Sequence, residues 1–321
     1  MDKTAELIAL QADLPRQARA QQQMSAALAA WQAGASVAPV LAAFDDYAAG
    51  TSLGDLPALA RLFGDDVSVA RSLVDPLVHQ FAQVLRTEPF AIVPTRHHSD
   101  GLMSTLLLAR RGDTVLTLVT VDGASLARQP KPTSACFVAA EEWEVVLSGT
   151  GRARLVERRQ EGLVTHRLDL VPGLSLGRQS EREALIFDEV DGALVLLRLQ
   201  RRNSQPRPTH ELALEDGRVL HQAAGSPNES RHEVAVALLG RMGRKDAAPL
   251  LAEIARDESH GESLRWQALR ECLGLDTGTG FWTLTAISRA GSDPLAVPAG
   301  ALRAQLLETY PQLAEVELCH A

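Results

Sequence analysis

The run WEVVLSGTGRARLVERR, residues 143–159, decides the fold of this chain, and a second run of the same kind, GALVLLRLQR, occupies residues 192–201. Both runs are rich in aliphatic and β-branched residues, which predicts β-strands. Shorter runs of this type lie between residues 88 and 225, separated by turn residues such as Pro172-Gly173 and Asp191-Gly192. About ten strands at such short spacing predict a closed antiparallel barrel or jelly roll rather than alternating β-α units.

The segments on both sides of these strands have helical patterns. Leu56, Leu59 and Leu62 recur at helical spacing, and Asp75-Pro76 predicts the start of a further helix. A polar stretch, AAGSPNES at residues 223–230, marks a boundary before a second helical region. We therefore predict an α+β protein with three parts. They are a helical N-terminal region (1–87), an antiparallel β-barrel (88–225) and C-terminal helical hairpins (226–321).

Composition narrows the range of partners. The chain has 321 residues, of which 45% are hydrophobic, so it contains enough apolar material for a sizeable core. Its formal net charge of -8 disfavours binding to a phosphate backbone. We expect no nucleic-acid partner.

The sequence also bears on where the protein works. Its first residues lack the apolar core of a signal peptide, and the uncharged stretch 20–44 contains too many Gln, Gly and Pro residues for a membrane span. The three cysteines are widely spaced, which fits neither a disulfide framework nor a metal knuckle. We expect a cytoplasmic protein that does not enter a membrane.

The central segment carries part of a known motif. In the first cupin motif, a histidine pair H-x-H precedes a Glu, and six further residues lead to a Gly at a hairpin turn. Glu142 and Gly149 keep this last spacing, so the segment resembles a cupin-type (RmlC-like) double-stranded β-helix. No histidine lies in residues 135–138. After the approximate P-x-G turn at Pro172-Gly173, the region where the last histidine ligand should follow reads GRQSEREAL (residues 177–185) and contains none. The resemblance thus implies a barrel with a degenerate metal motif.

The C-terminal region contains an internal near-repeat. Residues 231–240 align with residues 265–274, and both segments end in Leu-Gly. The pattern resembles HEAT-type helical repeats, which implies a protein partner bound through the C-terminal helices. Only two copies are visible, so we expect the pair to pack on the barrel or on a partner.

Charged residues near the central strands are candidates for a binding site. Glu142 and Glu144 lie two residues apart, so on a strand they share a face and are suited to acid/base chemistry or to a cationic ligand. The guanidinium groups nearby suit a small anionic ligand, although surface ion pairs explain them equally well. The candidate ligand-binding residues are Glu142, Trp143, Glu144, Arg152, Arg154, Arg178 and Arg182.

The leading hypothesis is a non-enzymatic protein for ligand sensing or protein interaction, built on a metal-free cupin-like barrel. Cupin sheets often pair, which allows a homodimer. One alternative is a metal-dependent cupin enzyme, an oxygenase or isomerase, that holds Fe, Mn, Ni or Zn through His98, Glu142 and His166. A second alternative is a pure assembly scaffold. The sequence contains no nucleophile elbow, phosphate-binding loop or dinucleotide fingerprint.

Overall fold

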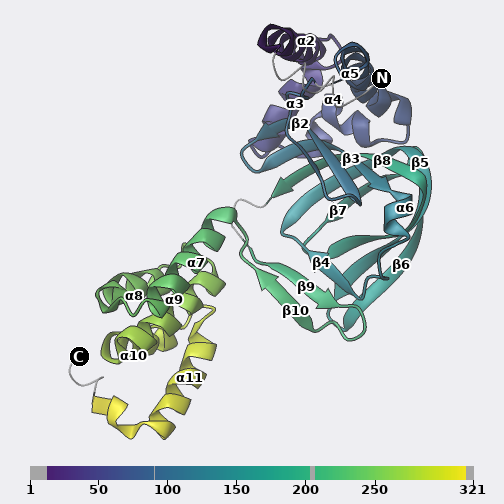
Figure 1. Ribbon diagram of the computed structural model, residues 1–321. Helices are drawn as coiled ribbons and strands as arrows, with labels where there is room; N and C mark the ends of the chain where they lie inside the picture. Colours follow the sequence, from purple (N-terminus) through teal and green to yellow (C-terminus); the bar gives the residue numbers. More distant parts are fainter. Residues whose placement is uncertain (1–12, 90, 203–206, 316–321) are drawn as a thin grey trace. The chain divides into compact units, whose positions relative to one another are not determined.

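A computed structural model describes residues 13–89, 91–202 and 207–315. It contains N-terminal helices, a central antiparallel sheet and C-terminal helices (Figure 1), so the predicted α+β class is confirmed. The chain divides into two compact units. The first comprises the described residues of Met1–Ala135, Ala140–Arg202 and Leu214–Gly217, and the second those of Cys136–Ala139, Asn203–Ala213 and Arg218–Ala321. This grouping does not test the predicted boundaries after residues 87 and 225, which stay predictions.

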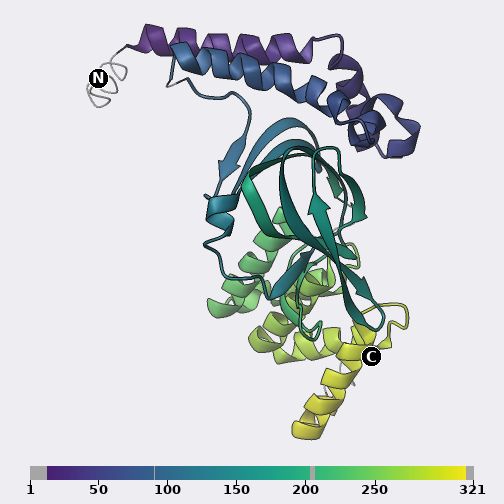
Figure 2. The ribbon, with the colours of Figure 1, turned by 90° about the vertical axis from the view of Figure 1, so that its right-hand side faces the viewer.

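Helices at the start of the first unit pack against one face of its sheet. The two longest, α2 and α5, lie side by side (Figure 2). The prediction that a helix starts at Pro76 is wrong, because α5 begins after the capping residue Asp66 and continues through the proline. Leu73 before the proline and Leu77 after it are buried in one core, which offsets the hydrogen bond that a proline removes. The elements are α2 (Leu14–Gln32), α3 (Ala38–Ala48), η1 (Leu53–Asp55), α4 (Pro57–Ala60), η2 (Arg61–Phe63) and α5 (Val67–Thr87).

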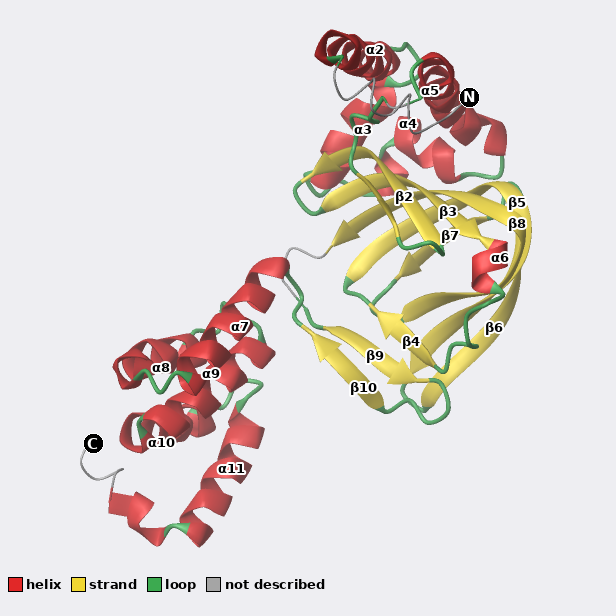
Figure 3. Cartoon of the chain, in the orientation of Figure 1, coloured by secondary structure: helices red, strands yellow, loops and turns green. Residues whose placement is uncertain are grey.

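The sheet of the first unit is antiparallel throughout its described pairs (Figure 3). Its strands follow the order β1-β2-β3-β8-β5-β6, and β7 pairs with β5 beside them. A short helix, α6 (Gly123–Leu126), follows β3. The strands are β1 (His97–Ser99), β2 (Met103–Arg111), β3 (Thr114–Asp122), β5 (Ala140–Arg159), β6 (Gly162–Leu170), β7 (Ser175–Gln179) and β8 (Glu183–Arg202).

The two longest strands, β5 and β8, run through positions at which the sequence predicts turns. Gly149 and the pair Asp191-Gly192 lie inside strands, so both predicted turns are wrong, whereas Pro172-Gly173 does connect β6 to β7. The register between β5 and β8 shifts around Ser148, which marks a bulge. Gly149 adopts a φ of 86°, and an added Cβ would lie 2.2 Å from the Ala193 carbonyl oxygen. The glycine therefore lets the strand bend while it stays paired with β8.

The two faces of this sheet differ. One face, carrying Val145 and Leu197, shares a core with the N-terminal helices. The opposite face, which we call the inner face, carries a second cluster that includes Val119, Val146 and Leu196. Because side chains alternate along a strand, Glu142, Glu144 and Val146 point to the same face.

The remaining strands and helices include a three-stranded sheet of order β10-β9-β4. Five helices of the second unit share one core, in which Arg265 is paired with Asp293. Their likeness to HEAT-type repeats stays a prediction. No helix in the described ranges combines the length and apolar content of a membrane span. The elements are β4 (Ser134–Phe137), β9 (Thr209–Ala213), β10 (Val219–Ala223), α7 (Pro227–Arg241), η3 (Lys245–Ala247), α8 (Ala248–Arg256), α9 (Glu262–Leu275), α10 (Thr277–Arg289), α11 (Ala296–Thr309) and η4 (Pro311–Leu313).

Candidate functional site

Polar side chains from three neighbouring strands meet on the inner face of the sheet. The register places Glu144 opposite Arg198, and Glu142 between Gln200 on one side and Arg178 on the other. Directly opposed residues of antiparallel strands share a face, so the backbone pairing itself brings these groups together. We call them the inner charge cluster, consisting of Glu142, Glu144, Arg178, Arg198 and Gln200.

Glu144 is the centre of this cluster. Its side chain is 2% exposed and binds two guanidinium groups, with Arg198 Nε 2.6 Å from Oε1 and Arg178 Nη2 3.0 Å from Oε2. Burial alone raises the pKa of this carboxyl, but the charges and hydrogen bonds of Arg198 and Arg178 outweigh burial and lower the pKa to about 2. Glu144 is therefore ionised at neutral pH.

Glu142 and Arg178 complete the network. Glu142 forms an ion pair with Arg178 and accepts a hydrogen bond from the Gln200 amide. Arg178 Nη1 lies 3.3 Å from Ser180 Oγ and 3.4 Å from the Glu183 carbonyl oxygen. Every nitrogen of the Arg178 guanidinium thus has a partner within the protein.

This saturation limits what the cluster can do chemically. A general acid needs a proton to donate near neutral pH, and Glu144 holds none there. A guanidinium that grips an anionic ligand needs donors that point to open space, and those of Arg178 point to carboxylates and oxygens of the same sheet. The arrangement fits a polar element of the core that fixes the strand register.

Trp143, a predicted binding residue, lies on the opposite face. Its indole Nε1 donates to Glu141 Oε1 at 3.0 Å, and its ring packs against the core shared with the N-terminal helices. The Arg201 guanidinium lies 3.9 Å from the centre of the Tyr47 ring and also binds Glu141. Alternation along β5 sends Trp143 away from Glu142 and Glu144, so the structure does not bring these three residues together.

Three of the predicted arginines also lie outside the cluster. Arg152 pairs with Glu189, and Arg154 Nε lies 2.9 Å from Asp188 Oδ1, in both cases between β5 and β8 at the surface. Arg182 is exposed in the turn between β7 and β8. Of the four arginines in the prediction, the structure brings only Arg178 to the two glutamates.

The alternative metal ligands are not gathered either. His98 on β1 and His166 on β6 are exposed and belong to the strands at opposite ends of the sheet order. Glu142 is already bound by Arg178 and Gln200. In the part of the chain that the structure describes, no group of three or more His, Cys, Asp or Glu residues is placed to hold a metal ion. The set His98, Glu142 and His166 does not fit a divalent cation.

Sequence reasoning missed Arg198 and Gln200. Both lie in GALVLLRLQR, where they alternate with leucines that face the core shared with the N-terminal helices. Two polar residues spaced by two on an otherwise apolar strand predict a shared face that needs polar partners on the neighbouring strand. Glu142 and Glu144 show the same spacing on the other predicted strand. The two matching patterns of polar residues were the sequence signal that could have indicated this pairing.

Comparisons with known proteins find solved structures that are similar to about a third of this chain. No family model matches the sequence, and the search of curated proteins finds no match. A cupin superfamily protein from Desulfitobacterium hafniense is similar at 15% identity and a TM-score of 0.23, over 33% of this chain and 83% of that chain. KdgF from a Halomonas species is similar at 15% identity and 0.25, over 34% and 88%. The Drosophila melanogaster CENP-C cupin domain is similar at 11% identity and 0.27, over 34% and 77%. TM-scores below 0.5 carry no argument about function.

Proposed function

We propose that this chain is a non-enzymatic protein that works by binding, as a ligand sensor or a protein-interaction protein, on a cupin-like sheet without a catalytic metal. The observation that carries the proposal is the inner charge cluster, in which Glu142 and Glu144 are held by Arg178, Arg198 and Gln200. Binding through the C-terminal helices, a homodimer and a cytoplasmic location belong to the same proposal.

The physical support comes from how a buried charge behaves. A carboxylate that donates a proton must first be protonated, and Arg178 and Arg198 keep Glu144 ionised. A carboxylate that binds a metal needs an accessible oxygen, and both oxygens of Glu142 already contact Arg178 or Gln200. Removing one partner would leave the other charge buried and unpaired, so the network resists exchange for a ligand. The cluster therefore supports a structural role for this part of the sheet.

Metal analysis tests this proposal. The full chain, purified without a histidine tag, is incubated separately with Fe(II), Mn(II), Ni(II) and Zn(II), desalted and measured by elemental analysis. We expect far less than one equivalent of each metal, and no change for His98→Ala or Glu142→Gln. One equivalent of a metal that is lost in both variants would contradict the proposal and favour the metal-dependent enzyme.

A further inference from the structure

A pocket of about 720 Å³ lies within the helices of the second unit, outside the inner charge cluster. Its volume is within the range of small-molecule sites, about 300–1,000 Å³. The pocket is lined by Trp266, Arg270, Leu273, Thr277, Leu302, Leu306, Tyr310, Gln312 and Leu313.

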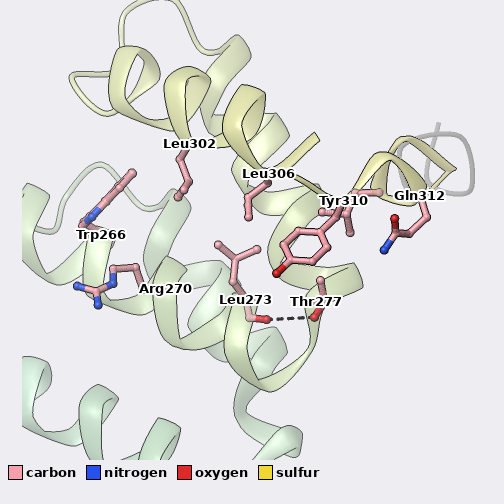
Figure 4. A pocket seen from close by; sticks show the side chains of 9 residues that line it. Trp266, Arg270, Leu273, Thr277, Leu302, Leu306, Tyr310 and Gln312 are labelled. Carbon is pink, nitrogen blue, oxygen red and sulfur yellow. Dashed lines mark hydrogen bonds between the residues drawn. The ribbon is translucent and has the colours of Figure 1, made fainter. Parts of the chain in front are cut away.

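The helices explain this lining. Trp266, Arg270 and Leu273 are spaced by four and three residues along α9, so they lie on one face of that helix. Leu302 and Leu306 are spaced by four along α11 and point toward Leu273 across the pocket (Figure 4). The walls are thus mainly aliphatic and aromatic.

One charge interrupts these apolar walls. Arg270 is the only charged residue of the lining and is exposed, and its guanidinium makes no hydrogen bond or ion pair with another residue in the described ranges. This differs from Arg265, five residues earlier on the same helix, whose guanidinium binds Asp293 and the Ala255 carbonyl oxygen. A guanidinium with its donors available beside apolar walls is complementary to one carboxylate on an apolar body.

We propose that this pocket binds a small apolar molecule that carries a single carboxylate, with the carboxylate at Arg270 and the apolar body against Trp266, Leu302 and Leu306. The inference deepens the proposed binding function and rests on it. It is independent of the inner charge cluster, because the pocket residues all belong to the second unit.

Calorimetric titration of the full chain with decanoate tests the inference, with decanol and decylamine as probes of equal chain length. We expect decanoate to bind at one site, and decanol and decylamine to bind at least tenfold more weakly. Arg270→Gln should weaken decanoate binding about tenfold and leave decanol unchanged. Arg231→Gln, which removes the same charge from α7 outside the pocket, should change nothing. Leu302→Trp, which fills the pocket, should abolish binding of both.

Three results would overturn the inference: no binding of decanoate, equal binding of decanoate and decanol, or unchanged decanoate binding in Arg270→Gln. Binding of an acidic amphipathic peptide without binding of decanoate would favour a protein partner instead. Circular dichroism of each variant shows whether it is folded. Leu302→Trp changes no charge, so it tests separately whether the ligand occupies the pocket. The decanoate titration tests the pocket, whereas the metal analysis tests the proposed metal-free function. A failure of one proposal can therefore be told from a failure of the other.

Discussion

At the scale of single residues, Glu144 is the most informative position of the sheet. Its carboxylate lies between two arginines on the inner face, where water does not screen their charges. The sequence predicted that Glu142 and Glu144 share a face, and the structure shows both bound to Arg178. Their partners on β8 could be found only once the strand pairing was known.

Glu144→Gln should lower the free energy of unfolding by about 3–5 kcal/mol, because Arg198 loses the carboxylate that binds it and Arg178 keeps only Glu142 as a counter-charge. Urea denaturation measures this loss. Glu189→Gln, which removes an exposed partner of Arg152, is the matched control and should cost about 0–1 kcal/mol. Equal losses in the two variants would show that the cluster does not stabilise the sheet.

Acid should also act through Glu144. The pKa of this carboxyl is lowered from 4.5 to about 2 in the folded chain, so the stabilisation is fully present above pH 4.5 and is lost as the pH falls toward 2. Denaturation midpoints measured between pH 6 and pH 3 should fall less steeply in Glu144→Gln than in the unchanged protein. If the denaturation midpoints of the two proteins fell with pH in parallel, the lowered pKa of Glu144 would be contradicted.

Gly149 is the residue at which the sheet bends. Gly149→Ala should cost about 1–2 kcal/mol for the left-handed backbone and a further 1–3 kcal/mol, roughly, for the contact with the Ala193 carbonyl. Gly192→Ala is the matched control, since its φ is 67° and nothing lies within 4 Å of the added Cβ. Thermal unfolding of both variants should show the larger loss at Gly149, and the reverse order would refute the bulge as the cause.

At the scale of elements, the bulge in β5 depends on helix α5. Arg71 Nε and Nη2 donate to the Leu147 carbonyl oxygen at 2.9 and 2.6 Å, beside the register shift. A carbonyl at a bulge loses its regular strand partner, and this arginine supplies one. Helix α5 therefore completes the hydrogen bonding of the strand as well as covering its core.

Arg71→Ala should lower the free energy of unfolding by about 1–3 kcal/mol, because it leaves a buried carbonyl without a donor. Arg86→Ala, at an exposed position of the same helix, should be close to neutral. Denaturation in guanidinium chloride compares the free energies of unfolding of the two variants. A neutral Arg71→Ala would mean that water replaces the guanidinium at the bulge.

At the scale of the whole molecule, the two units have separate cores. We expect two calorimetric unfolding transitions. Asp293→Asn should move only the transition of the second unit, by the equivalent of about 3–5 kcal/mol, because Arg265 stays buried without its counter-charge. Asp246→Asn, which removes an exposed partner of Arg244, should move neither. One transition that shifts in both Asp293→Asn and Glu144→Gln would show that the units unfold together.

The sequence by itself determined the α+β class, the strand-rich centre and the shared face of Glu142 and Glu144, because hydrophobic periodicity and side-chain alternation are local properties. It did not reveal that β5 and β8 continue through Gly149 and Asp191-Gly192, since a glycine is compatible with a turn and with a bulge. Only the tertiary structure decided which arginines meet the glutamates. Strand register joins Glu144 to Arg198 across 54 residues, and no local pattern encodes such a pairing.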